Sequence, residues 1–369
     1  MATPFVFQFG VEIELLLGSR SKTHKSWKSL ASELSTRLAK AGIPNHLNQG
    51  NDKSAENYFE WSITQEVTVP AQAGKNLWGL ELVSPIFTPD APWTAQLHTI
   101  FTSVLRKHFV LTPSPHCSTH VHISTVPPLS APQLASVAKN ILYFEPALDA
   151  LLPVDRASSY WCQSNRASTI LKPLPFLPHC LAHLDACAAS ASTDAVVHAM
   201  CLFPASSAYG RAHGYTQDFV HGVWKWDFSG LLSSTTLFPS NSTSAYALAT
   251  DYTSATGHEY APTRTPTLEF RQPPGSLSAS DAAAWVELGV SFVAGAVAGC
   301  GGGGDLDAGG AGGGGGVSDA LMEELWWLLS VGAQGTGIGE LRGVEGLFVQ
   351  AGGRGRGKGK GGAGKGKAK

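Results

Sequence analysis

The chain has 369 residues, of which 43% are hydrophobic and 15% are charged, as expected for a globular protein with one large domain or two ordinary ones. Seven of its 26 Lys and Arg residues lie in 351–369, so the rest of the chain, with 28 Asp and Glu, is about nine charges negative. An acidic body is a poor surface for nucleic acids, but clustered carboxylates can hold cations.

The six cysteines are scattered and form no CxxC pair, which argues against a disulfide-stapled secreted domain and against a zinc ribbon. Residues 1–10 lack a basic segment followed by a long apolar run, so no secretory signal is predicted. The most apolar stretch, Ala282–Gly299, is interrupted by Glu287 and by three glycines, which predicts a buried helix rather than a membrane span. We therefore expect a soluble, cytoplasmic protein with no membrane partner.

Alternation of apolar and polar residues and helical spacing of apolar residues predict the elements in the first 300 residues. The predicted strands cover Phe5–Leu17, Tyr58–Val69, Leu77–Val83, Cys117–Thr125 and Thr267–Gln272. The predicted helices cover Lys25–Ala41, Ala91–Lys107, Ala131–Leu152 and Ser280–Ala298. The stretch 173–222, rich in Pro, Ala and Ser, shows no clear periodicity.

The composition changes after Cys300, since eleven glycines fall between Gly301 and Gly316. Such a segment cannot bury a core and is typical of a flexible linker. The sequence therefore predicts a catalytic domain over 1–299, a linker over 300–316, a short helical extension over 317–350, and a disordered Gly/Lys/Arg tail over 351–369. This basic tail would make at most weak, salt-sensitive contacts with nucleic-acid phosphates, and we interpret it as a low-complexity tail.

Glu12 and Glu14 belong to the first predicted strand. Residues two apart on a strand point to the same side, so both carboxylates share one face about 7 Å apart. Like charges on a largely apolar strand are costly unless a cation or an arginine lies between them. The alternative is a solvated face of an amphipathic strand.

Three further segments carry residues with the same potential. Glu81 lies within an apolar run, where a surface residue at a strand end is the alternative. His120 and His122 share a strand face, which suits a metal or phosphate oxygens as well as ordinary core or surface histidines. Glu269 and Arg271 also share a face, either as a metal ligand beside a phosphate-binding guanidinium or as an ordinary ion pair.

Together these segments are more informative than any one of them. Four predicted strands, far apart in the chain, offer oxygen or imidazole ligands, and Mg²⁺ prefers several carboxylate oxygens together with substrate phosphates. No GxxxxGK(S/T) phosphate loop and no HExxH zinc motif are present, so nucleotide binding would depend on metals and arginines.

In this order, the segments FGVEIELLL (9–17), WGLELVSP (78–85), CSTHVHIS (117–124) and LEFRQPPGSLSASDAAAWV (268–286) resemble those of the amidoligase family. This family is a branch of the carboxylate–amine ligases, which include glutamine synthetase and glutamate–cysteine ligase. The resemblance covers roughly residues 5–299. It implies an α+β fold like that of glutamine synthetase, in which a curved, mainly antiparallel sheet forms a half-barrel with outer helices and an active site on its concave face.

The resemblance also implies roles for individual residues. Glu12, Glu14 and Glu81 would be magnesium ligands, and His120 and Glu269 would complete a second metal position. His122 would lie nearer the ATP phosphates and Arg271 would steady the transferred phosphoryl group, so that Arg271, His122 and Glu12 are the catalytic candidates. Arg264 is a candidate phosphate contact, although a surface arginine is an equal alternative.

The implied reaction is the joining of a carboxylate to an amine, both small molecules or peptides, with ATP and two or more Mg²⁺ ions, through an acyl phosphate. Two alternatives are glutamate–cysteine ligase itself and a regulator that binds ATP and metal but has lost catalysis. The sequence departs from the family pattern at Thr119, where Gly is usual, at Glu66, where Asp is typical, and in the poorly matching stretch 231–266. It provides no prediction of the oligomeric state.

Overall fold

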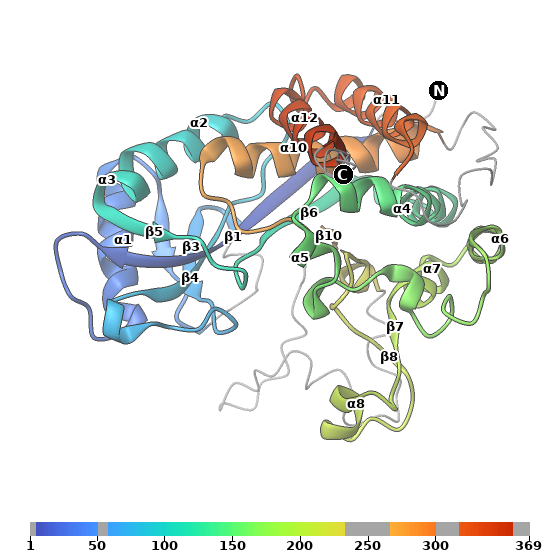
Figure 1. The fold of residues 1–369 in the computed structure, drawn as a ribbon, viewed down its shortest axis with the longest axis horizontal. Helices are drawn as coiled ribbons and strands as arrows, with labels where there is room; N and C mark the ends of the chain where they lie inside the picture. The colour runs from blue at the N-terminus through green and yellow to red at the C-terminus, as the bar shows by residue number, and fades with distance from the viewer. Residues whose placement is uncertain (1–4, 51–57, 233–265, 300–316, 357–369) are drawn as a thin grey trace, which may run out of the picture.

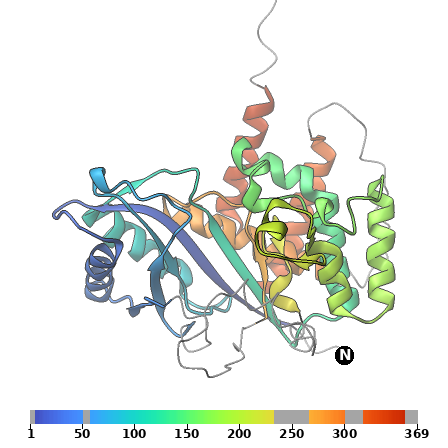
Figure 2. The same cartoon turned by 90° about the horizontal axis from the view of Figure 1, so that it is seen from below.

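The structure is a computed structural model that describes residues 5–50, 58–232, 266–299 and 317–356, the last five of them by backbone alone. It is a mixed α+β protein with an open, mainly antiparallel sheet and helices packed beside it (Figure 1). Figures 1 and 2 both place α1 and α6 at opposite ends of the molecule, with the main sheet between them.

Within the described residues the main sheet has eight strands in the order β2-β3-β4-β1-β6-β10-β9, and β5 pairs with β1. All pairs are antiparallel except β2 with β3. The strands of this sheet are β1 (Val6–Ser19), β2 (Asn45–Leu47), β3 (Trp61–Gln65), β4 (Trp78–Val83), β5 (Phe109–Thr112), β6 (Thr119–Val126), β9 (Trp226–Asp227) and β10 (Leu268–Phe270). A separate two-stranded sheet joins β7 (Leu202–Phe203) and β8 (Phe219–Val220).

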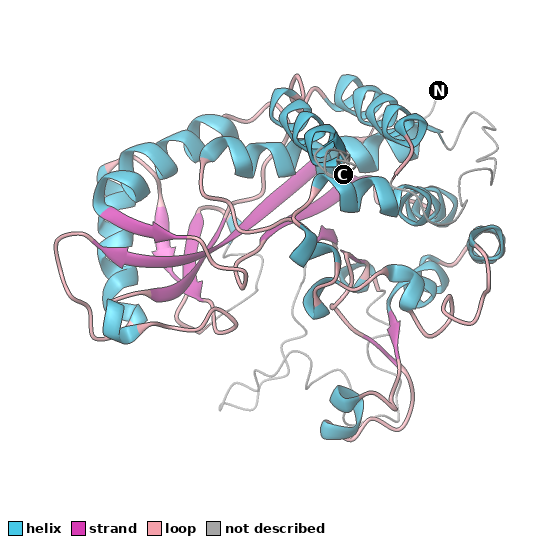
Figure 3. Cartoon of the chain, in the orientation of Figure 1, coloured by secondary structure: helices cyan, strands magenta, loops and turns pink. Residues whose placement is uncertain are grey.

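The helices lie along one side of the main sheet and at its two ends (Figure 3). They are α1 (Trp27–Lys40), α2 (Trp93–His98), α3 (Arg106–His108), α4 (Ala131–Leu151), α5 (Val154–Ala157), α6 (Leu177–Ala189), α7 (Thr193–Cys201), α8 (Ala208–Ala212), α10 (Ala279–Ala298), α11 (Asp319–Thr336) and α12 (Arg342–Arg356). A π-helical stretch, Thr99–Leu105, joins α2 to α3, so the predicted helix over 91–107 is continuous but not uniformly α-helical. The unassigned stretch 173–222 contains α6, α7, α8 and the two-stranded sheet of β7 and β8.

Strand β1 organises the sheet because it pairs with three other strands. Its odd-numbered residues from Phe7 to Leu17 are buried in the main core, whereas Glu12 and Glu14 point to the opposite face, as the strand period of two requires. One face of β1 therefore packs in the core, and the opposite face carries the two carboxylates.

Helix α10 covers the apolar face of the sheet. A Cβ added to Gly289 of this helix would lie 3.4 Å from Ile123 and Phe270 and 3.6 Å from Val121. These residues alternate with His120, His122 and Glu269 on β6 and β10, so the polar residues lie on the face away from α10.

Helix α10 is the one described helix long and apolar enough to cross a membrane, but 72% of its apolar window is buried within the protein. This burial agrees with the predicted buried helix. Part of the cover is α11, which approaches so closely that a Cβ on Gly332 would lie 1.8 Å from the carbonyl oxygen of Ser291. Only glycine permits this backbone-to-backbone contact.

The predicted helical extension therefore packs on the rest of the protein through α10. Helix α12 reaches Arg356, past the residue where the predicted tail begins. The predicted linker 300–316 and the tail beyond 356 lie outside the described residues.

One side chain on α10 provides a test of this packing. Burial raises the pKa of Glu287 to about 7, and no described residue donates a hydrogen bond to its buried Oε2. Because the folded pKa exceeds the unfolded value, stability should fall as the pH rises from about 4.5 to 7 and stay constant above that. We expect Glu287→Gln to remove this fall and to raise the free energy of unfolding at pH 8 by about 1–3 kcal/mol.

Urea unfolding measured from pH 4.5 to pH 8 checks the Glu287 prediction. The exposed Glu345 on α12 provides a matched control, since Glu345→Gln should leave the pH dependence unchanged. An identical pH dependence in wild type and Glu287→Gln would contradict the prediction.

Candidate active site

The strand register brings the polar residues of four strands into one row. Glu14 lies opposite Glu81 across the β1–β4 pair, and Glu12 lies opposite His120 across the β1–β6 pair. His122, also on β6, lies opposite Glu269 of the next strand, β10. Directly opposed residues on one face are near neighbours, so these side chains converge.

Glu12 lies at the centre of the row, between the two histidines. Its Oε2 is 3.3 Å from Nδ1 of His120, and its Oε1 is 3.3 Å from Nε2 of His122. Oε1 of Glu269 approaches the same imidazoles, at 3.2 Å from His120 Nδ1 and 3.8 Å from His122 Nε2. Glu14 Oε1 lies 3.7 Å from His120 Nε2.

Three groups of side chains in this row could each hold a metal ion, because their ligand atoms lie within 4.8 Å of one another. The groups are Glu12 with His122 and Glu269, Glu12 with Glu81 and His120, and Glu14 with Glu66 and Glu81. All five residues predicted as metal ligands belong to these groups. Glu66, one residue beyond β3, was noted only as a departure from the family pattern, and the structure places it among the candidate ligands.

The donor atoms of the three groups indicate which cation each group could bind. The group of Glu14, Glu66 and Glu81 offers carboxylate oxygens alone, which is what Mg²⁺ prefers. The two groups around Glu12 add an imidazole nitrogen each, which also suits Mn²⁺ and other transition metals. The residues therefore fit Mg²⁺, most directly at the group that contains Glu14.

The electrostatics of Glu14 reflect its enclosure. Burial raises the pKa of the Glu14 carboxyl, and the charge of His120 and the N–H of Ser118 only partly offset this rise. Ser118 N donates to Glu14 Oε2 over 2.7 Å. A bound cation would favour the ionised carboxylate and so oppose this rise.

Arg271 and Glu269 form the closest ion pair at the site, with Nη1 2.6 Å from Oε1. Burial by itself raises the pKa of Glu269, but the charges of Arg271, His122 and His120 outweigh it and the net shift is downward. Glu269 is therefore ionised and ready to act as a ligand at neutral pH. The Nε atom of Arg271 is buried and donates no hydrogen bond to a described residue.

Solvent exposure divides the site into a floor and a mouth. The side chains of His120 and Glu14 are 6% exposed, whereas those of His122 and Arg271 are 26% and 21% exposed. His122 and Arg271 therefore lie at the edge of the site nearest solvent, whereas Glu14 and His120 form its enclosed part.

Asp227 on β9 extends the row to a fifth strand, and sequence reasoning missed it. It lies opposite Glu269, and Ser229 donates to it from both its backbone N, over 2.8 Å, and its hydroxyl, over 2.9 Å. Burial raises the pKa of Asp227, and the nearby charge of Glu269 adds to this effect. The short β9 has no alternating pattern that would have revealed it.

A second network of charged side chains, outside the row, positions the end of β10. Lys225 Nζ lies 2.7 Å from Glu145 Oε1 and 2.7 Å from Asp149 Oδ1, both on α4. Gln272, next to Arg271, donates to Asp149 as well. The backbone of Arg271 donates to the carbonyl of Lys225 over 3.0 Å, so this network positions the end of β10.

The seven predicted site residues that the structure describes all lie in this one region. Arg264, the remaining candidate phosphate contact, lies outside the described residues. Thr119, where the family usually has Gly, is fully buried and shares a hydrogen bond of 2.7 Å with the hydroxyl of Ser276. Its side chain is therefore accommodated at the start of β6.

A family sequence model matches the part of the chain that contains β1, β4 and β6. The sequence model of a family described as "Putative amidoligase enzyme" matches residues 6–193, more than half of the chain. The chain belongs to this amidoligase family. No curated protein matches it. The matched range includes the site residues of β1, β4 and β6 but ends before β10, whose pairing with β6 brings Glu269 into the site.

Divalent cations should stabilise this amidoligase, because they would relieve repulsion among buried carboxylates. At a concentration one hundred times the Kd, a cation that binds only the folded state adds about 2.7 kcal/mol. We expect Mg²⁺ or Mn²⁺ to raise the Tm by several degrees in thermal unfolding, and Glu81→Gln to reduce the shift. An equal shift with K⁺ at matched ionic strength, or no shift with either divalent ion, would contradict the prediction.

Proposed function

We propose that this protein is an ATP-dependent carboxylate–amine ligase that forms an amide through an acyl phosphate. The observation that carries the proposal is the convergence of Glu12, Glu14, Glu81, His120 and Glu269 into adjoining candidate metal groups with Arg271 at their mouth. Membership of the amidoligase family supports the class of reaction. The finer architecture that we propose is a sheet curved as in glutamine synthetase, with this row on its concave face.

The first step is phosphoryl transfer. A carboxylate oxygen of one substrate attacks the γ-phosphorus of ATP, and ADP leaves. This chemistry requires in-line positioning and neutralised charge more than a covalent nucleophile. Bound Mg²⁺, held by Glu12, Glu14, Glu81, His120 and Glu269, would supply that neutralisation.

The residues at the mouth of the site would contact the phosphate groups of ATP. Arg271 offers a planar guanidinium suited to phosphate oxygens, and Glu269 fixes it on one side. His122 donates to or accepts from Thr267 over 3.2 Å through Nδ1, which leaves Nε2 directed toward Glu12 and Glu269. We assign Arg271 to the transferred phosphoryl group, His122 to the adjoining ATP phosphates and Arg264 to a further phosphate contact.

The second step forms the amide. The amine attacks the acyl carbon, phosphate leaves, and the amine nitrogen loses a proton. Water would compete with the amine for the acyl phosphate, so a site that excludes water favours amide formation over hydrolysis. The low exposure of Glu14 and His120 shows how well this floor is enclosed.

The test is to measure ADP and phosphate release with Mg²⁺ and ATP across pooled amines and carboxylates. The proposal predicts release that needs one pool of each kind. Release with neither pool, or none with any combination, would overturn it. Consumption of glutamate and cysteine together would narrow the activity to glutamate–cysteine ligase, and tight ATP binding without turnover would indicate a regulator.

A further inference from the structure

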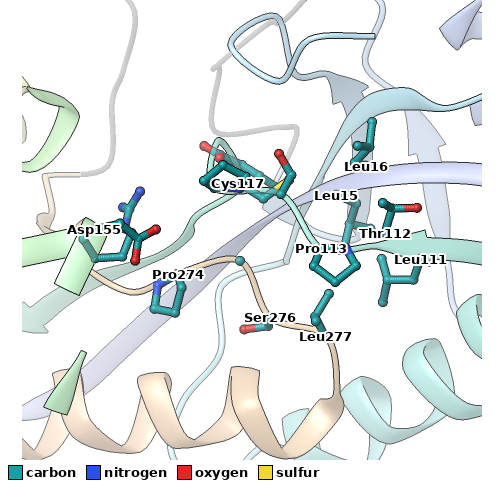
Figure 4. Close-up of a pocket in the computed structure, with 15 residues that line it drawn as sticks. Leu15, Leu16, Leu111, Thr112, Pro113, Cys117, Asp155, Pro274, Ser276 and Leu277 are labelled. Carbon is teal, nitrogen blue, oxygen red and sulfur yellow. The ribbon is translucent and has the colours of Figure 1, made fainter. Parts of the chain in front are cut away.

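A cavity of about 260 Å³ lies beside the candidate metal groups and is not used by the mechanism above (Figure 4). Glu14 forms part of its wall, so the cavity borders the all-carboxylate group directly. Sites for drug-sized ligands usually enclose roughly 300–1,000 Å³. A space of this volume therefore suits a smaller molecule, of about the size of a free amino acid.

The two ends of the cavity differ in chemistry. Asp155 lies at one end, and Leu111, Thr112 and Pro113 lie at the other (Figure 4). Leu16 and Leu277 add to the apolar lining. A ligand that fits would carry charged groups at one end and an aliphatic part at the other.

Cys117 belongs to the apolar lining rather than to the chemistry. It is buried and clusters with Leu16, and burial raises the pKa of its thiol to about 12. The thiol is therefore neutral at physiological pH and is not an activated nucleophile. It contributes an uncharged wall between the two ends of the cavity.

The charged end offers both signs of charge. Arg156 is buried and held in place because its Nε donates to the carbonyl of Gln272 over 3.1 Å and its Nη2 to the carbonyl of Arg271 over 3.0 Å. No described residue accepts a hydrogen bond from its Nη1. The neighbouring Asp155 is exposed at the first turn of α5. A fixed guanidinium beside a carboxylate matches the α-carboxylate and α-ammonium of an amino acid.

The position of Arg156 joins this end to the proposed active site. Through the carbonyl of Arg271 it contacts the residue assigned to the transferred phosphoryl group. The charged end of the cavity is thus linked to the backbone of Arg271, and the apolar end lies toward β5. A substrate bound in this orientation would place its polar end beside the backbone of Arg271.

We propose that this cavity binds a free α-amino acid with an aliphatic side chain as one of the two substrates. The α-carboxylate would pair with Arg156, the α-ammonium with Asp155, and the side chain would occupy the space between Leu111, Pro113 and Leu277. The role as a ligase substrate rests on the proposed function, whereas binding in the cavity does not.

Calorimetric titration with L-leucine, without nucleotide, tests the proposal on the full chain. We expect saturable binding at one site, weakened about tenfold or more by Asp155→Asn because a hydrogen bond to a charged group is lost. Leu277→Trp should abolish binding by filling the cavity, and Leu277 is exposed enough to accept the change. Asp185→Asn and Val349→Trp alter exposed residues elsewhere and should bind as wild type does.

The outcomes distinguish a failure of this proposal from a failure of the proposed function. No binding of L-leucine by the wild type, or equal binding by wild type, Asp155→Asn and Leu277→Trp, would overturn it. L-glutamate binding more tightly than L-leucine would also overturn it, because the apolar end would then not select the side chain. Glu12→Gln should still bind L-leucine while losing ATP turnover, so a protein that binds L-leucine in this cavity without any ATP turnover would contradict the proposed function alone.

Discussion

Glu12→Gln is expected to lower the rate of ADP formation by about 10³-fold or more, because one carboxylate would be lost from two candidate metal groups at once. Glu12 contacts both imidazoles of the row, at 3.3 Å each. Gln has nearly the same shape but carries no charge, and it is a weaker ligand for a divalent cation. The measurement is kcat for ADP formation at saturating ATP and Mg²⁺.

The same substitution should leave the fold intact. The charge of Glu12 opposes the ionisation of the adjacent Glu269, so its removal relieves repulsion in the metal-free protein. We expect the metal-free Tm to be unchanged or slightly raised. Glu340→Gln, at a side chain 73% exposed, is the matched control and should keep full activity. More than a tenth of wild-type activity in Glu12→Gln would exclude Glu12 from the central role assigned to it.

Lys225→Met should lower the free energy of unfolding by about 3–5 kcal/mol, since it breaks a buried ion network by removing one partner. The Lys225 side chain is 4% exposed and lies 2.7 Å from carboxylate oxygens of both Glu145 and Asp149. Its loss leaves two acids on α4 without their cation. Urea unfolding at neutral pH measures the effect.

Two comparisons make the Lys225 prediction specific. Lys139→Met removes a surface pair with Asp185, whose side chain is 61% exposed, and should cost only about 0–1 kcal/mol. Adding Glu145→Gln and Asp149→Asn to Lys225→Met should recover most of the lost stability, because the uncompensated charges are then gone. A loss below about 1 kcal/mol in Lys225→Met would show that the network contributes little.

The local structure around the site could be predicted well from the sequence. The alternation through Val11, Glu12, Ile13 and Glu14 places both acids on one strand face, and β1 has that geometry. The same reasoning placed His120 and His122 together on β6. These predictions succeed because a strand has a period of two wherever it lies in the fold.

The pairing of strands far apart in the chain could not be predicted from local sequence patterns. Nothing local in β10 indicates that Glu269 lies opposite His122, and only the family resemblance suggested that they meet. Glu66 lies just past β3, where the strand pattern no longer determines the direction of a side chain. Asp227 belongs to a strand of two residues, which is too short for any periodicity.

Some of the missed features left a signal in the sequence. Glu145 and Asp149 are four residues apart and therefore share a face of α4, and an acidic pair within an apolar helix invites a buried cation such as Lys225. Gly332 and Gly295 lie in helices that were expected to be separated by a flexible linker. Their close backbone contact is a property of packing between α10 and α11, and composition alone does not reveal it.

The most direct test of the central claim follows oxygen from substrate to phosphate. The protein is incubated with ATP, Mg²⁺, the amine pool and carboxylates labelled with ¹⁸O, and the phosphate product is examined by mass spectrometry. An acyl-phosphate ligase transfers one labelled oxygen from the carboxylate to inorganic phosphate, with ADP as the other product. Unlabelled phosphate, or label in AMP accompanied by pyrophosphate, would contradict the mechanism.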